Sequence, residues 1–261
     1  MMTKKKQTTI NQPYFGKHNE KGVKTASFVG LFLSISATLF IWAGSERINC
    51  SPLIWKVSLC INLIFFALTW ITYLPFRKTD KLLGNGMMAM FCMISVFWIF
   101  GFAGFYFYFL FASIHLWVKI SISVGMTLIL IHLVYQTHND IEKAFRHNKN
   151  LFSLMYVEEE HAYTITQKAA NFLDKAKPAR NPLRSYHLYA AIFLPIFVLS
   201  LNEILTPTTS NGHSPFWLLA FLCSPMLVWG VDPFVQIFVT RIYYPITLEH
   251  NTGKPVLMKD W

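Results

Sequence analysis

The feature that most constrains this chain is a series of apolar runs in which about 18 to 21 consecutive positions carry no charge. At a rise of about 1.5 Å per residue, a helix of that length crosses a hydrocarbon layer about 30 Å thick. Inside lipid every backbone N–H and C=O needs a partner within the chain, so a spanning segment is either a helix or part of a closed barrel. The runs are continuous rather than alternating, which predicts helices.

The composition agrees with lipid as the solvent. Only 14% of the 261 residues are charged, against about 25% in ordinary soluble domains. We therefore expect an all-α, polytopic integral membrane protein with six transmembrane helices. The predicted spans are Thr25–Ser45, Val57–Phe76, Met87–Leu110, Ile120–Gln136, Ser185–Asn202 and Phe216–Val239.

The third span leaves two interpretations open, because the 37 residues of Leu82–Val118 contain no Asp, Glu, Lys or Arg. That stretch is longer than one crossing needs. We favour a single helix over Met87–Leu110 followed by an aromatic interfacial stretch. Two crossings, giving seven spans in all, would place later basic connections outside.

The distribution of Lys and Arg predicts the orientation. The start, the connection after the second span, the Thr137–Arg184 segment and the tail carry 6, 3, 8 and 3 of these residues, which is 20 of the 23. Cytoplasmic connections of membrane proteins are enriched in Lys and Arg. We therefore expect both ends in the cytoplasm, in a membrane that we predict to be the bacterial inner membrane.

The predicted organisation has five parts. A basic cytoplasmic tail (1–24) precedes four transmembrane helices (25–136), a cytoplasmic helical segment (137–184), two further transmembrane helices (185–240) and a cytoplasmic tail (241–261). Within the cytoplasmic segment, Asp140–Lys149 and Glu158–Lys175 are predicted to be helical. The tail from Tyr244 is predicted to be irregular because it contains two prolines and a glycine.

The net charge of +10 does not predict a nucleic-acid partner, since topology alone explains where the basic residues lie. The partners that we expect are the lipid bilayer and another membrane protein or a toxin. The four cysteines predict no disulfide framework, because Cys60, Cys92 and Cys223 fall within apolar spans. Nothing in the sequence predicts a cofactor or an oligomeric state.

Three residues form a candidate polar site inside the membrane. Asp232 lies nine positions before Arg241 in the sixth span, and ionisable groups at such depth often mark ion or proton pathways. Pro233 follows, and a residue before proline is disfavoured in helical geometry. We therefore predict a broken sixth helix at Asp232, with His132 of the fourth span as a further polar candidate. The alternative is a kinked helix whose carboxylate is satisfied by a neighbour or by water.

A second candidate site is a contact surface in the third span. The aromatic run Phe97–Phe111 contains Gly101, Gly104 and Phe105, and small residues let helices approach closely in lipid. These three residues are therefore candidates for a contact with another membrane protein. Lipid-facing or core packing of the same residues is the interpretation that we favour.

No motif predicts catalysis or a metal site. The chain has no nucleophile elbow, phosphate loop or dinucleotide-binding turn, and no His pair with zinc-site spacing. The leading hypothesis is a non-enzymatic protein that works through helix contacts, such as an immunity or exclusion protein against a membrane-inserting toxin or secretion partner, or a subunit of an envelope assembly. The alternative is a small transporter or channel using Asp232. A membrane enzyme using His132, His138 or Asp140 is a third hypothesis.

Overall fold

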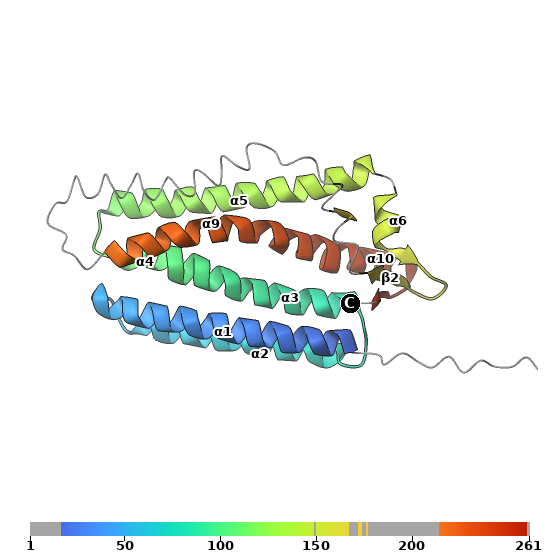
Figure 1. Cartoon of the computed structure of the whole chain (residues 1–261), viewed down its shortest axis with the longest axis horizontal. Helices are drawn as coiled ribbons and strands as arrows, with labels where there is room; N and C mark the ends of the chain where they lie inside the picture. Colours follow the sequence, from blue (N-terminus) through green and yellow to red (C-terminus); the bar gives the residue numbers. More distant parts are fainter. Residues whose placement is uncertain (1–16, 149, 167–171, 174–175, 177–213, 260–261) are drawn as a thin grey trace, which may run out of the picture.

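The computed structural model describes residues 17–148, 150–166, 172–173, 176 and 214–259, without the side chains of 214–218 and 221. Within these residues the chain is mostly helical, and the helices run side by side along one long axis (Figure 1). Five helical segments are long and apolar enough to cross a membrane, as expected of a multi-pass membrane protein. The predicted fifth span, Ser185–Asn202, lies outside the described residues.

The first two helices form an antiparallel hairpin (Figure 1). Helix α1 covers Lys17–Arg47 and α2 covers Leu53–Phe76, so α1 begins eight residues before the predicted span. The residues of α2 that are buried are Ser58, Asn62, Thr69 and Tyr73. Its outer face carries Leu63, Trp70 and Leu74, which are 41–64% exposed. A helix with polar groups inside and apolar groups outside suits lipid rather than water.

The stretch that left two interpretations open forms one continuous helical segment. Helix α3 (Leu82–Phe97) runs into a π-helical segment, η1 (Trp98–Tyr106), and then into α4 (Phe107–Phe111). Together they make a single candidate span, Leu82–Phe111. Helix α5 (Leu116–His147) follows and extends well beyond the predicted fourth span. It therefore includes most of the predicted helix Asp140–Lys149.

The last long helix runs antiparallel to α3 and packs directly against it (Figure 1). It consists of α9 (Ser214–Ile237), the π-helical segment η2 (Phe238–Tyr243) and α10 (Tyr244–Thr252). The predicted break at Asp232 is wrong, because α9 continues through both Pro225 and Pro233. Helices that pack on neighbours tolerate an internal proline when the surrounding groups satisfy the freed backbone.

A three-stranded sheet, which the sequence did not predict, lies at one end of the bundle. After the short helix α6 (Leu151–Met155), β1 (Val157–Glu158) pairs antiparallel with β2 (Tyr163–Thr166), and β2 pairs parallel with β3 (Val256–Lys259). Two predictions are corrected here. The start of the predicted helix Glu158–Lys175 forms strands, and the tail predicted to be irregular forms α10 and β3.

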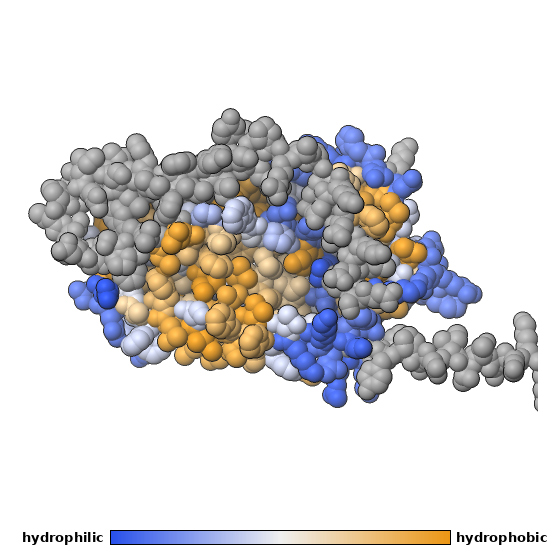
Figure 2. Space-filling view, viewed as in Figure 1, coloured by the Kyte–Doolittle hydropathy of each residue, from blue (hydrophilic) through white to orange (hydrophobic). Residues whose placement is uncertain are grey.

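We call the end of the bundle with this sheet the sheet end. The beginning of α1, the α2–α3 connection and the end of α5 also lie there, whereas the α1–α2 connection, the loop before α5 and the beginning of α9 lie at the opposite end (Figure 1). Hydrophobic residues form a broad band across the middle of the face in Figure 2, and hydrophilic residues gather at the ends. This is the distribution that a bilayer requires.

Candidate functional site

A polar cluster around Arg241 lies where the last long helix meets α3, near the sheet end. One guanidinium nitrogen, Nη1, donates a hydrogen bond to Oδ1 of Asn85 over 3.1 Å. Two glycines allow this approach. A Cβ on Gly22 of α1 would lie 2.8 Å from Nδ2 of Asn85, and a Cβ on Gly86 would lie 2.7 Å from the Arg241 carbonyl oxygen. Helix α1, helix α3 and the last long helix thus meet around the half-buried guanidinium group of Arg241.

Tyr156 connects the segment that follows α5 to the same place. Its side chain is fully buried, and its hydroxyl donates a hydrogen bond to the carbonyl oxygen of Thr240 in η2. Burial raises the pKa of Tyr156 far above its ordinary value, so the hydroxyl keeps its proton and remains a donor at neutral pH. Single π-helical turns are often found at functional sites, and this one holds the Arg241 side chain next to Asn85.

Further contacts tie the sheet to the helix ends. Glu249 of α10 accepts a hydrogen bond from the Val256 N–H at 3.0 Å and forms a 3.2 Å ion pair with Lys81. Asn19 of α1 donates to the carbonyl oxygen of Thr79 at 2.7 Å. The sheet end therefore joins α1, the α2–α3 connection, α10 and β3.

Two ion pairs join the end of β1 and the residue after it to residues just before and within β3. Lys254 lies 2.7 Å from Glu158, and Lys259 lies 2.7 Å from Glu159. The hydrogen bond from each lysine holds the pKa of its glutamate below the ordinary value. Both carboxylates are therefore charged at neutral pH, when the pairs stabilise the sheet.

The predicted polar residues of the membrane interior lie on two neighbouring helices. Helices α5 and α9 run parallel and side by side (Figure 1), and the Phe145 and Tyr244 rings meet at 4.9 Å. His132 is 13 residues before Phe145, and Asp232 is 12 residues before Tyr244. At about 1.5 Å per residue, both lie about 18 Å from that ring contact and at similar heights. Asp232 is half-buried, His132 is exposed, and Pro233 is exposed within the continuous helix.

The three predicted partner-contact residues lie inside the chain's own bundle. A Cβ on Gly101 would lie 3.0 Å from Cδ2 of Leu227, and a Cβ on Gly104 would lie 2.9 Å from Cβ of Cys223. Phe105 is completely buried. These residues pack η1 against α9, so a surface for another protein has to be sought elsewhere.

Sequence reasoning missed a buried polar seam between α1 and α2. Asn62 donates from Nδ2 to the Thr38 hydroxyl at 3.1 Å and to the Ser34 carbonyl oxygen at 3.2 Å. Towards the opposite end, Trp98 donates to the Ser58 hydroxyl at 2.9 Å. The only hint in the sequence was an asparagine within a long apolar run, and such residues often hydrogen-bond across helices in membranes.

Within the described residues, no group of three or more His, Cys, Asp or Glu side chains could hold a metal ion. His132, His138 and Asp140, the candidates for catalysis, all lie on α5. Comparison of the chain with protein-family models, with curated proteins and with solved structures gave no match.

Proposed function

We propose that the chain is a six-span protein of the bacterial inner membrane with both ends in the cytoplasm. Two observations support this topology. Of the 14 Lys and Arg residues that the structure describes, 11 belong to elements at the sheet end, namely the start of α1, the α2–α3 connection, the end of α5 and the segment from η2 to β3, as expected of a cytoplasmic face (Figure 1). In addition, β2 ends at the sheet end and α9 begins at the opposite end, and one crossing by the predicted Ser185–Asn202 span would account for this change of side.

We infer further that the protein acts without catalysis, through helix contacts with another membrane component such as a toxin, a secretion partner or an envelope assembly. The observation that carries this proposal is the sheet end. Its strands, ion pairs and backbone hydrogen bonds join α1, α3 and α10, which are far apart in the sequence. A bundle tied in this way presents a fixed outer surface, as a docking protein needs, and resists the rocking that alternating access requires.

The outer face of α2 is the surface that we propose for this contact. Because Gly101, Gly104 and Phe105 are buried within the bundle, the contact must use side chains that point outward. Leu63, Trp70 and Leu74 do so, and α2 lies at the edge of the bundle in the α1–α2 hairpin (Figure 1). Large side chains of this kind serve equally as lipid contacts, so the experiment below separates the two.

Site-specific photocrosslinking in cells tests the proposal. A photoreactive amino acid at Leu63 or Leu74 on α2 should give one discrete protein adduct. The same residue at Leu128 on α5, which is also exposed at 60%, serves as the matched control and should give lipid adducts only. If the α2 positions crosslink to nothing but lipid, the contact proposal fails.

A second candidate function is transport of an ion or proton past Asp232. The similar heights of Asp232 and His132 along their helices favour it. Gln136, one turn beyond His132, favours it too, because its buried Oε1 has no hydrogen-bond partner among the described residues. Polar groups at one level of two adjacent helices suit a pathway. Asp232→Asn should then abolish ion flux in reconstituted vesicles, whereas Glu142→Gln, in an exposed pair with Arg146, should leave it unchanged. Equal flux in both variants would remove Asp232 from the function.

A further inference from the structure

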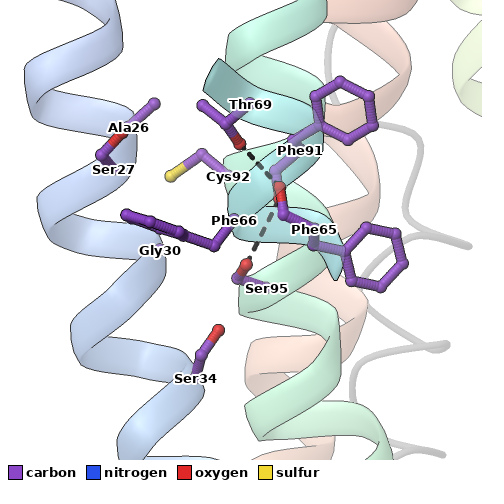
Figure 3. A pocket seen from close by; sticks show the side chains of 10 residues that line it. All are labelled: Ala26, Ser27, Gly30, Ser34, Phe65, Phe66, Thr69, Phe91, Cys92 and Ser95. Carbon is purple, nitrogen blue, oxygen red and sulfur yellow. Dashed lines mark hydrogen bonds between the residues drawn. The ribbon is translucent and has the colours of Figure 1, made fainter. Parts of the chain in front are cut away.

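A small cavity lies between α1, α2 and α3, near the middle of the hairpin. Side chains from all three helices surround it (Figure 3). Its polar lining consists of Ser27 and Ser34 from α1, Thr69 from α2, and Cys92 and Ser95 from α3. Gly30 faces the same space, because a Cβ built there would have only Ser95 Oγ nearby, at 3.6 Å. The cavity has room for about one water molecule.

Ser27 provides an independent sign of a ligand. The residue is only 9% exposed, and its hydroxyl oxygen, which is buried, has no hydrogen-bond partner among the described residues. Unsatisfied buried hydroxyls are rare in folded proteins, since burying one without a partner is costly. In an apolar bundle a lipid tail cannot supply that partner.

The other hydroxyls of the cavity have spare capacity as acceptors. The Thr69 hydroxyl donates a hydrogen bond to the Phe65 carbonyl oxygen at 2.9 Å, and the Ser95 hydroxyl donates one to the Phe91 carbonyl oxygen at 3.4 Å, as the dashed lines in Figure 3 show. A hydroxyl has one proton but two lone pairs. Both oxygens can therefore still accept a hydrogen bond from a molecule inside the cavity.

We propose that this cavity is a binding site for one ordered water molecule, held by the Ser27 hydroxyl and by the oxygens of Thr69 and Ser95. Water is the ligand that fits the observations, because the space is about one molecule in size and buried waters typically make about three hydrogen bonds. The water accepts a hydrogen bond from the Ser27 hydroxyl and donates hydrogen bonds to the oxygens of Thr69 and Ser95. It thereby links α1 to both α2 and α3, two helical turns from the Asn62–Ser34 hydrogen bond, which joins α1 to α2 alone.

The proposal is independent of the docking and transport functions, and it predicts which cysteine is near water. X-ray radiolysis turns bound water into hydroxyl radicals, which oxidise the nearest side chains. Cys92 lines the cavity, whereas Cys223 is buried against Gly104 in the η1–α9 contact. In the full chain in lipid nanodiscs, mass spectrometry should find Cys92 oxidised at least several-fold faster than Cys223. Equal rates would overturn the proposal.

The direction in which the Ser27→Ala substitution changes thermal stability gives a second test. Ser27→Ala removes one of the three groups that hold the water, so it should slow Cys92 oxidation to the rate of Cys223. It should also lower the thermal midpoint by about 2 to 4 °C. Ser36→Ala is the matched control, since Ser36 is a half-buried serine of the same helix whose hydroxyl, unlike that of Ser27, already donates to the Phe32 carbonyl oxygen. A higher midpoint for Ser27→Ala than for the parent would contradict the proposal, because losing an unsatisfied hydroxyl is stabilising.

Discussion

Asn85 accepts a hydrogen bond from Arg241 over 3.1 Å and thereby joins α3 to η2 across 156 positions of the sequence. The contact lies close to the sheet end, beside Gly86, whose missing side chain lets the two helix backbones meet. It places the positive charge of the last long helix at the boundary between the apolar bundle and the polar sheet.

Asn85→Ala should lower the free energy of unfolding by about 1.5 to 3 kcal/mol, the range for a hydrogen bond to a charged group. The expected loss is large because the variant leaves a half-buried guanidinium without one of its acceptors. Unfolding in mixed SDS micelles measures it. Glu142→Ala removes the partner of Arg146 in an exposed pair and should cost less than about 0.5 kcal/mol. Equal losses in the two variants would show that Asn85 has no special role.

Tyr156→Phe should destabilise the contact between the sheet end and η2. The hydroxyl donates to the Thr240 carbonyl oxygen from a fully buried position, so its removal should cost about 1 to 3 kcal/mol of unfolding free energy. Tyr135→Phe, at a position that is 66% exposed on α5, should change stability little. The rate of backbone hydrogen exchange of residues 238–243 should rise in Tyr156→Phe alone. An unchanged rate there would show that the Tyr156 hydroxyl does not stabilise η2.

Two glycines where α9 packs against η1 and α3 should tolerate an added methyl group unequally. A Cβ at Gly104 would approach Cys223 Cβ to 2.9 Å, whereas a Cβ at Gly230 would stay 3.4 Å from the Phe97 ring. Gly104→Ala should therefore lower the unfolding free energy by about 1 to 3 kcal/mol, and Gly230→Ala should be close to neutral. Adding Cys223→Ala to Gly104→Ala should recover part of the loss in a double-mutant cycle. Additive effects would mean that these two positions do not meet.

Acid should weaken the sheet before it unfolds the helices. The pKa values of Glu158 and Glu159 are lowered in the folded chain by Lys254 and Lys259. Their contribution to stability is therefore complete above the ordinary glutamate pKa of 4.5 and disappears as the pH falls through the lower folded values. At pH 7 the double variant Glu158→Gln, Glu159→Gln should show faster proteolysis near Ala162 than the parent. The difference should vanish at strongly acidic pH; a difference that persists there would contradict the ion-pair explanation.

Much of the helical framework could be predicted from hydrophobicity alone. The uncharged runs identify α1, α2, α3 with η1, α5 and α9, because a membrane selects length and polarity rather than any particular residue. The start of α1 was predicted too late in the chain, and the end of α5 was predicted too early. Lys17, Lys21 and Lys24 of α1 and Glu142 and Lys143 of α5 are charged, and hydropathy does not reveal that a helix continues into the polar region.

The sheet and the polar cluster could not be predicted, because both depend on contacts between distant segments. Tyr163–Thr166 has the aromatic and β-branched residues that strands favour, but its parallel partner, Val256–Lys259, lies 93 positions further along the chain. The tail was misjudged because Pro245 and Gly253 looked like helix breakers. In the structure Pro245 occupies the first turn of α10, and Gly253, with a φ of 70°, ends that helix.

The most direct test of the account is the side of the membrane on which each end of the bundle lies. In a chain whose native cysteines are replaced, Ser51→Cys probes the α1–α2 connection and Lys259→Cys probes β3; both positions are exposed. A maleimide that cannot cross the membrane should label Ser51→Cys in intact cells and Lys259→Cys only after the membrane is opened. Labelling of Lys259→Cys in intact cells, or of both positions alike, would contradict a bundle whose sheet end faces the cytoplasm.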